Sequence, residues 1–117
     1  MLIYKILLPD EWAQLVEKGK TAGAPIDLAD GFIHFSTAEQ VRETAAKHFA
    51  GAGDLVLAAV EAAPLGQDLK WEVSRGEALF PHLYRALSLS DVAWTATLEK
   101  TAAGHVFPAL PEPAEKV

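Results

Sequence analysis

The sequence predicts an α+β domain in which two helices pack on a mostly antiparallel sheet system. Two segments with helical patterning are bounded by helix-starting and helix-ending residues, Ser and Thr before one of them and Gly after both. An apolar run at 55–60 indicates a buried strand, and the alternation at 69–73 indicates a half-buried one. We expect a single domain over residues 1–108 and a loose, Pro-rich tail over residues 109–117.

The first two elements are a strand over residues 2–8 and a helix that begins at Pro9 and runs to about Lys18. The strand segment is apolar and partly β-branched or aromatic, apart from Lys5 in its middle. Proline suits the first turn of a helix, and the two acids that follow it suit the positive end of the helix dipole. Gly19 can end this helix. Its buried stripe is predicted to consist of Trp12, Leu15 and Val16.

A loop, a second strand and a second helix are expected next. Residues 20–30 contain glycine, proline and small side chains and predict a loop, and residues 31–35 predict a strand. Ser36 and Thr37 are each followed three residues later by Glu or Gln, which is a capping-box pattern, so a helix should begin here and run to about Ala50. The apolar face of this helix is predicted to be Ala38, Val41, Ala45 and Phe49.

The second half of the chain predicts further strands. The continuous apolar run at 55–60 is typical of a central strand that is buried on both faces. At 69–73, Leu69, Trp71 and Val73 alternate with polar residues, which predicts a strand with these three side chains in the core. Residues 75–89 show no clean period and predict an ordered loop with short pieces of strand. The remaining predictions are a turn at 64–66 and strands at 92–98 and 106–107.

The composition excludes several classes of protein. Ten Lys and Arg against sixteen Asp and Glu give a formal net charge of −6, which disfavours a surface that binds nucleic acid or an anionic membrane along a broad front. Without Cys, disulfides, thiolate zinc sites and cysteine nucleophiles are excluded. The four His lie far apart in the sequence, so no metal site is predicted. We expect a cytoplasmic protein, because no signal peptide or membrane span is apparent. The sequence indicates no oligomeric state.

The segment Asp30–Thr37 combines three features that suit ligand binding. Phe32, His34 and Ser36 share one face of the predicted strand. This strand leads Ser36 and Thr37 to a helix N-terminus, where unpaired N–H groups and the helix dipole favour an anion. A His, a hydroxyl and a helix end in this arrangement would hold a phosphate or a ribose. The simpler interpretation is that Ser36 or Thr37 caps the helix and that His34 is a core residue.

The segment Lys70–Arg85 has a net charge of +1 within a chain of −6. Aromatic planes for a base and guanidinium groups for phosphate would suit a nucleotide. The residues that offer them are Trp71, Phe80, His82, Tyr84, Arg75 and Arg85. The simpler interpretation places Trp71 and Phe80 in the core, because Trp71 lies on the apolar face of the alternating strand. Glu72 lies on the opposite face, and its role stays open.

Two strings, Asp-Gly-Phe-Ile-His-Phe-Ser-Thr at 30–37 and Lys-Trp-Glu…Leu-Phe-Pro-His-Leu-Tyr at 70–84, resemble domain-of-unknown-function family 952, a family of small, mostly bacterial proteins. The resemblance covers residues 2 to 95. It implies an ADP-ribosyltransferase-like fold, with small split antiparallel sheets and helices packed around them. In that superfamily a His-x-Ser or His-x-Thr strand binds an NAD ribose, which His34-Phe35-Ser36 matches. The bulky Phe35 stands where the superfamily usually has Gly.

The resemblance also implies roles for other residues. Transferases of this fold have an aromatic side chain that stacks on nicotinamide, expected at Tyr84 or Trp71. They also have an acid that polarises the ribose, expected at Glu72 or Glu99. Related RNA phosphate-removing enzymes of this fold use Arg and His around an ADP-ribose-like pocket, which Arg75, His34 and His82 resemble, although the acidic net charge argues against RNA as the ligand.

One principal hypothesis and two alternatives follow. The principal hypothesis is an ADP-ribosyltransferase-like pocket for NAD, as a substrate, or for another phosphorylated, nucleotide-like ligand. Its ligand-binding residues would be His34, Ser36, Thr37, Arg75 and Tyr84, and its catalytic residues would be Glu72, His34 and His82. Glu72 would stabilise an oxocarbenium-like transition state. The first alternative is a non-catalytic binding or regulatory module on the same fold. The second is a hydrolase with His34 and His82 as general acid and base.

Overall fold

The computed structural model describes residues 1–111, except for the side chain of Arg75. The α-helices in this part of the chain are α1 (Pro9–Lys18), α2 (Pro25–Asp30) and α3 (Val41–His48). The strands are β1 (Leu2–Leu7), β2 (Lys20–Thr21), β3 (Ile33–His34), β4 (Leu55–Glu61), β5 (Leu69–Val73), β6 (Leu79–Leu83), β7 (Leu87–Ser88), β8 (Val92–Thr101) and β9 (Gly104–Val106).

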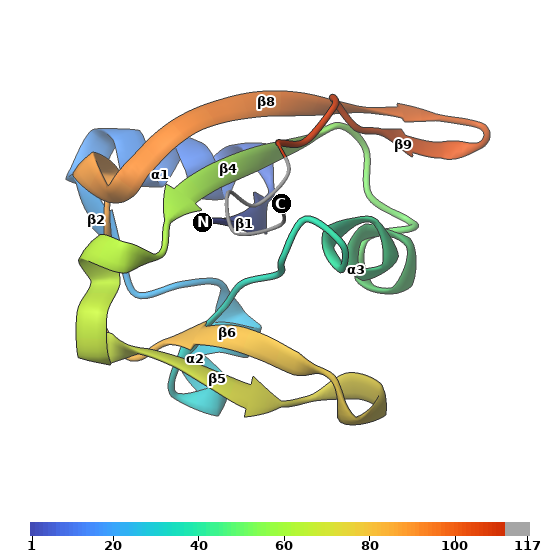
Figure 1. The fold of residues 1–117 in the computed structure, drawn as a ribbon. Helices are drawn as coiled ribbons and strands as arrows, with labels where there is room; N and C mark the ends of the chain where they lie inside the picture. The colour runs from blue at the N-terminus through green and yellow to red at the C-terminus, as the bar shows by residue number, and fades with distance from the viewer. Residues whose placement is uncertain (112–117) are drawn as a thin grey trace.

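The paired strands of the described residues are all antiparallel and form three sheets. A large sheet has the strand order β1-β4-β8-β9, a small sheet has the order β3-β6-β5, and β2 pairs with β7. Figure 1 shows the large sheet above the small one, with α3 between them at one side. The prediction of an α+β fold with mostly antiparallel sheets is therefore confirmed.

The strand β4 is the centre of the large sheet. It pairs with β1 on one side and with β8 on the other, and Leu55, Leu57 and Val60 are fully buried in it. This confirms the predicted central strand. Burial on both faces also explains the unbroken apolar run, because neither face of this strand meets water.

Two hydrophobic clusters lie on the two faces of the large sheet. Alternate residues of β1 point to opposite faces, so Ile3 belongs to one cluster and Tyr4 to the other. The first cluster includes Leu15 of α1 and residues of the small sheet. The second includes Val41 and Ala45 of α3, which confirms the apolar face predicted for that helix.

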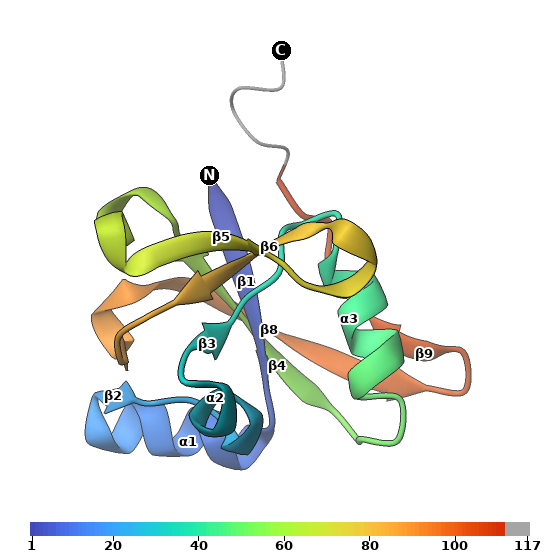
Figure 2. The same ribbon diagram turned by 90° about the horizontal axis from the view of Figure 1, so that it is seen from below.

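The small sheet meets the large one at a single main-chain pair within the described residues. The N–H of Tyr4 donates to the carbonyl of Ser36 at 2.8 Å, and the N–H of Ser36 donates to the carbonyl of Tyr4 at 2.8 Å. Beyond this pair, β3 turns toward β6, and the N–H of Phe35 donates to the carbonyl of Pro81. Figure 2 shows β3 running between α2 and α3 as it crosses from one sheet to the other.

The helix α1 has the predicted bounds. Gly19 ends it with φ of 81°, and its N–H donates to the carbonyl of Leu15 at 2.8 Å. Leu15 is fully buried and Trp12 is half-buried, but Val16 is 50% exposed. Including Val16 in the buried stripe was wrong, because it lies about 100° further round the helix than Leu15 and points away from the sheet.

Between residues 20 and 41 the structure differs from the predicted elements. The predicted loop at 20–30 contains β2 and α2. The predicted strand is reduced to Ile33–His34, and the next helix begins at Val41. The helix starts late because Thr37 and Gln40 close a turn first: the N–H of Thr37 donates to Gln40 Oε1 at 3.0 Å, and the N–H of Gln40 donates to Thr37 Oγ1 at 3.3 Å. The capping pattern therefore marks a turn that precedes the helix.

The strand β5 exists as predicted, but the core covers its apolar face at one end only, where Leu69 packs against the first hydrophobic cluster. Trp71 is 39% exposed and Val73 is 65% exposed, whereas Glu72 accepts hydrogen bonds from residues of the same small sheet. The interpretation of Trp71 as a core residue was wrong. The reason is that the core covers this face only at Leu69 and its partner Leu83, whereas Trp71 lies further along the strand, where the same face meets solvent. Phe80, on β6, is buried as expected.

The segment after β9 packs against the large sheet as far as it is described. Phe107 and Leu110 contact the second hydrophobic cluster, and the Arg42 guanidinium lies over the Phe107 ring at 5.3 Å from its centroid. Of the predicted tail, residues 112–117 lie outside the described residues. Among the described helices, none has both the length and the apolar character required to cross a membrane.

Candidate functional site

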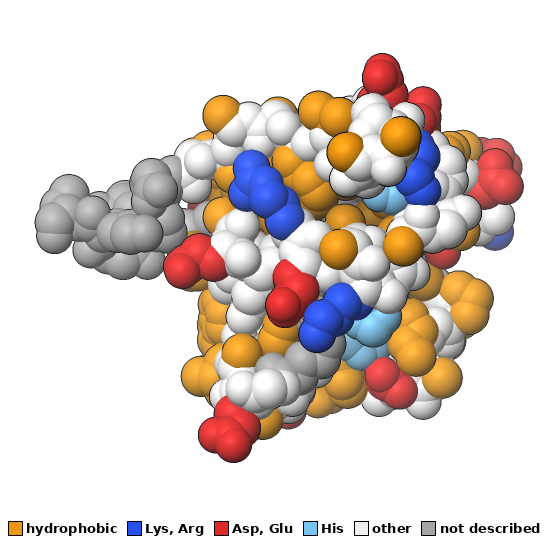
Figure 3. Space-filling view, turned by 90° about the vertical axis from the view of Figure 1, so that its right-hand side faces the viewer, with side chains coloured by type: hydrophobic (Ala, Val, Ile, Leu, Met, Phe, Trp, Pro, Cys, Tyr) orange, Lys and Arg blue, Asp and Glu red, His pale blue; other side chains and the backbone are white. Residues whose placement is uncertain are grey.

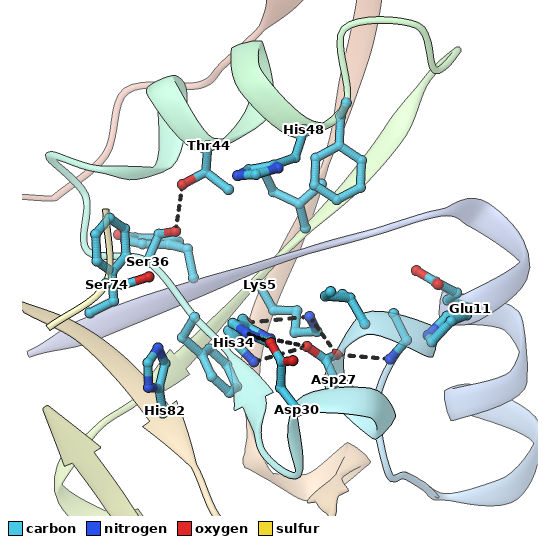
Figure 4. A pocket seen from close by; sticks show the side chains of 18 of the residues that line it. Lys5, Glu11, Asp27, Asp30, His34, Ser36, Thr44, His48, Ser74 and His82 are labelled. Atoms are coloured by element: carbon cyan, nitrogen blue, oxygen red, sulfur yellow. Dashed lines mark hydrogen bonds and ion pairs between the residues drawn. The ribbon is translucent and has the colours of Figure 1, made fainter. Parts of the chain in front are cut away.

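A pocket of about 530 Å³ opens where β1 and β3 separate. Figure 4 shows α3 on one side of it, with Thr44 and His48, and α2 on the other, with Asp27 and Asp30. Its walls include Ile6, Phe35, Phe49 and Phe80, and its polar side chains include Lys5, Glu11, Asp27, Asp30, His34, Ser36, Thr44, His48, Ser74 and His82. Pockets of this volume hold small molecules of nucleotide size.

His34 is held between two carboxylates of α2. Its Nδ1 lies 2.5 Å from Asp27 Oδ1, and its Nε2 lies 2.9 Å from Asp30 Oδ2. Both ring nitrogens therefore face carboxylate oxygens of α2. The His34 side chain is 32% exposed. It borders the pocket, but its hydrogen-bonding capacity is already used by α2.

Beneath His34 lies a buried ion pair between Lys5 and Asp27. Lys5 Nζ is 3.0 Å from Asp27 Oδ2, and the Asp27 side chain is fully buried. This carboxylate also accepts from the N–H groups of Ala24, at 2.8 Å, and His34, at 3.1 Å. Burial raises the pKa of Asp27. Hydrogen bonds from His34, Lys5 and Ala24 and the positive charge of Lys5 lower it by more, so the pKa of Asp27 falls to about 2.

A second hydrogen-bonded group lies on the small sheet. His82 Nδ1 is 2.8 Å from Glu72 Oε1, and the Tyr84 hydroxyl donates to the same oxygen at 2.7 Å. These bonds, first that from His82 and then that from Tyr84, lower the pKa of Glu72. The hydrogen bond to Glu72 raises the pKa of Tyr84. His82 is buried and borders the pocket, so Glu72 fixes the orientation of a pocket residue.

Phe32 joins the two groups. Its ring stacks on His82 at 4.1 Å between centroids and lies 4.6 Å from His34 and 5.2 Å from Tyr84. The His34 and His82 rings are 5.4 Å apart and nearly perpendicular, because β3 pairs His34 with His82 of β6. The fold thus brings together His34, from one of the two candidate segments, and His82, Glu72 and Tyr84, from the other.

The other predicted site residues lie in different places. Ser36 lines the pocket and exchanges a hydrogen bond with the Thr44 hydroxyl at 2.9 Å, whereas the Thr37 hydroxyl is used in the turn with Gln40. The side chain of Arg75 lies outside the described residues. The alternatives Trp71 and Glu99 do not line the pocket in the described part of the chain.

The pocket offers little unpaired positive charge among its described residues. Its lining has one Lys, which is engaged by Asp27, and the carboxylates of Asp27, Asp30 and Glu11. On the face in Figure 3, basic and acidic side chains are interspersed, and no single basic patch forms there. The apolar and aromatic walls therefore suit the sugar and ring of a nucleotide better than its phosphates.

Sequence reasoning missed Lys5, Asp27, Asp30 and Phe32 as site residues. Lys5 carried a usable signal, because a single charged residue in an apolar strand requires a buried partner. Asp27 and Asp30 lie seven and four residues before His34, within the segment that was predicted to be a loop. Recognising the short helix α2 would have placed both acids on the turn that precedes the His.

A family model described as "Protein of unknown function (DUF952)" matches residues 6–95. The chain belongs to the DUF952 family. The resemblance seen in the two sequence strings is therefore confirmed. The matched range includes every residue of the His34 and His82 groups except Lys5. No match to this DUF952 chain was found among curated proteins.

Solved structures similar to this DUF952 protein include two of protein CC0527 from Caulobacter crescentus. Its crystal structure is 57% identical in sequence, covers 90% of this chain and 92% of that chain, and has a TM-score of 0.86. Its solution NMR structure is 58% identical, covers 89% of this chain and 90% of that chain, and has a TM-score of 0.80. These comparisons support the α+β fold with small antiparallel sheets.

Replacing Glu72 with Gln in the DUF952 protein is expected to lower the pKa of Tyr84 toward the usual tyrosine value. The hydrogen bond to the Glu72 carboxylate and its negative charge now oppose ionisation of the phenol. The titration of Tyr84 followed by NMR of its ring carbons measures this shift. Glu61→Gln is the control: Glu61 contributes to the raised pKa of Tyr4 but not to that of Tyr84, so the Tyr84 titration should not change. An unchanged Tyr84 titration in Glu72→Gln would contradict the hydrogen-bond assignment.

Proposed function

We propose that the protein binds NAD or another phosphorylated, nucleotide-like ligand in the pocket beside His34, on an ADP-ribosyltransferase-like fold. The observation that carries the proposal is the pocket of about 530 Å³ bordered by both His34 and His82. Two antiparallel sheets that meet at Tyr4 and Ser36 and then diverge support the fold. The His-x-Ser strand lies at this divergence, where a ribose could contact it.

The chemistry of the walls supports a nucleoside part as the portion of the ligand that enters. Phe35, Phe49 and Phe80 offer flat apolar surfaces for a ring. Ser36 and Asp30 offer polar groups for sugar hydroxyls at the same pocket. Phosphates would remain toward the mouth, because the only described Lys of the lining is already paired.

A second candidate, a non-catalytic binding or regulatory module, is favoured by the position of Glu72. If the protein were a transferase, Glu72 would have to approach the ribose to stabilise positive charge. Instead Glu72 does not border the pocket in the described chain, and its Oε1 accepts from both His82 and Tyr84. The Phe32 ring covers the His82 ring from the other side. The same binding site therefore supports recognition more directly than cleavage.

Thermal melting with NAD, ADP-ribose, nicotinamide and inorganic phosphate tests the binding proposal. A ligand at 100 times its dissociation constant stabilises by about 2.7 kcal/mol, which is about 10 °C for a domain of this size. We expect such a rise with NAD or ADP-ribose and its loss in His34→Asn. Asn keeps a donor where Nδ1 faces Asp27 but removes the rest of the ring. His105→Asn is the control, since His105 bonds to the carbonyl of Gly53 and neither residue lines the pocket.

Two results separate the candidates. Nicotinamide release from NAD by the wild-type protein, lost in Glu72→Gln, would establish the transferase and contradict the module. Binding without any NAD consumption would establish the module. If none of the ligands raises the melting temperature, or if His34→Asn retains the full rise, the binding proposal is wrong.

A further inference from the structure

The edge of β1 that faces the pocket carries a main-chain N–H and C=O without a partner on β3. In an antiparallel strand, successive residues direct their main-chain groups to opposite edges. Tyr4 exchanges two hydrogen bonds with Ser36 of the β3 side, each of 2.8 Å. Two residues later, Ile6 therefore directs its N–H and C=O to that same side, while Lys5 and Leu7 direct theirs to β4.

The strand that would pair with Ile6 is diverted by side chains. Continuing the register of the Tyr4 and Ser36 pair would place His34 opposite Ile6. However, the N–H of His34 donates to Asp27 Oδ1 at 3.1 Å, and its carbonyl accepts from Lys5 Nζ at 3.3 Å. Both groups of His34 that would complete the ladder are thus engaged elsewhere. No other main-chain bond to Ile6 from this side is present within residues 1–111.

The unpaired groups of Ile6 face the pocket. Ile6 is among the lining residues and is 6% exposed, and main-chain groups with so little contact with bulk water are costly to leave unbonded. Phe35, Phe49 and Phe80 line the same space. The pocket therefore combines one donor and one acceptor at a fixed spacing with apolar walls that suit a flat ring.

We propose that Ile6 binds a planar ring whose amide N–H lies beside its C=O, either a lactam edge of a nucleobase or a ring carboxamide. The inference rests on the proposed function and names the part of the ligand that lies against β1. One strand residue exchanges two hydrogen bonds with one amide unit, as in a hydrogen-bonded pair of an antiparallel ladder. An added peptide strand would pair through alternate residues along an edge, but here the chain turns into α1 at Pro9, so one residue is open.

Amide hydrogen exchange followed by NMR tests the open edge without any substitution. In the ligand-free protein, the N–H of Ile6 should exchange at least about tenfold faster than those of Tyr4, Lys5 and Leu7. Uracil at millimolar concentration should shift the Ile6 amide resonance and slow its exchange. Its matched control is 1,3-dimethyluracil, which keeps the ring and the carbonyls but has no N–H. Benzamide and N,N-dimethylbenzamide form the second pair and distinguish an exocyclic carboxamide from a lactam.

The outcomes separate this inference from the proposed function. A response to uracil or benzamide that its N-methylated control lacks supports the amide subsite and identifies which form of amide is preferred. Protection of Ile6 without any probe, or equal responses to a probe and its control, overturns the inference. A response to N-acetyl-valine methylamide alone overturns it in favour of strand addition. If ADP-ribose raises the melting temperature while neither amide probe affects Ile6, the subsite is wrong and the binding proposal stands.

Discussion

Replacing Asp27 with Ala is expected to lower the free energy of unfolding by about 3–5 kcal/mol, which is the usual cost of leaving a buried charge without its partner. Lys5 is 7% exposed, and its ammonium group would lose the carboxylate at 3.0 Å. The N–H groups of Ala24 and His34 would lose their acceptor as well. For a domain of this size the melting temperature should fall by roughly 15 °C.

Urea unfolding of Asp27→Ala beside Asp30→Asn measures this effect against a matched control. Asp30 also contacts His34, but its side chain is 42% exposed, so its loss should cost no more than about 1 kcal/mol. Equal destabilisation by the two substitutions would contradict the role of Asp27 as the buried centre of the site. Asp27→Asn should be nearly as harmful as Asp27→Ala, because an amide offers one acceptor atom where two are used.

The free energy of unfolding should also depend on pH through the ionisation of Asp27. The pKa of Asp27 is lowered in the folded protein to about 2 from an ordinary 3.8, so the folded state favours the ionised form. The corresponding stabilisation, about 2 kcal/mol, is present above pH 4 and is lost as the pH falls toward 2. This part of the acid destabilisation should be absent in Asp27→Asn. An identical acid profile in the two proteins would show that Asp27 titrates normally.

Replacing Gly23 with Ala is expected to cost about 2–5 kcal/mol, the second large effect. Gly23 has φ of 111°, and a Cβ there would lie 2.5 Å from Asp27 Cβ and 2.6 Å from Asp27 Oδ2. The backbone conformation alone costs roughly 1–2 kcal/mol for a residue with a side chain. The overlap adds to this, because Asp27 cannot move without breaking its bonds to Lys5 and His34.

Gly31→Ala separates these two contributions. Gly31 also has positive φ, 85°, but a Cβ there would meet nothing within 4 Å, so only the conformational cost applies. Chemical unfolding of both variants gives the difference, which measures how rigidly Asp27 is held. If Gly23→Ala were no more destabilising than Gly31→Ala, the Asp27 side chain would have to be mobile.

Much of the fold could be predicted from local patterns. The run at 55–60 is apolar because β4 is covered on both faces. The helix α1 begins at Pro9 and ends before Gly19, as these two residues predict. The exposure of Trp71 and Val73 could not be predicted, because alternation shows that the two faces of a strand differ but not how far along the strand one of them is covered. Trp71 is apolar and exposed, while Glu72, on the opposite face, accepts hydrogen bonds from His82 and Tyr84.

The site was predicted in part. His34, His82, Glu72 and Tyr84 were named from composition and resemblance, and the antiparallel pairing of β6 with β3 on one side and β5 on the other brings them together. Asp27 could not be named, because its importance comes from one carboxylate that bonds at once to Lys5 of β1, Ala24 before α2 and His34 of β3. No sequence spacing reports such a three-way contact, since Lys5 lies more than twenty residues away from Asp27.

The single main-chain junction between the two sheets has a consequence for how the molecule opens. A region held by few main-chain bonds unfolds locally at lower free energy than the rest. In the described chain, main-chain bonds join the small sheet to the large one only at Tyr4 and Ser36. Its other contacts come from the first hydrophobic cluster and from the side chains around Asp27, so the segment beside the pocket is the region expected to open. Its local opening would widen the pocket while the large sheet stays intact. A ligand that contacts both β1 and β3 would add a second connection between the two sheets. It would therefore raise the free energy of this local opening.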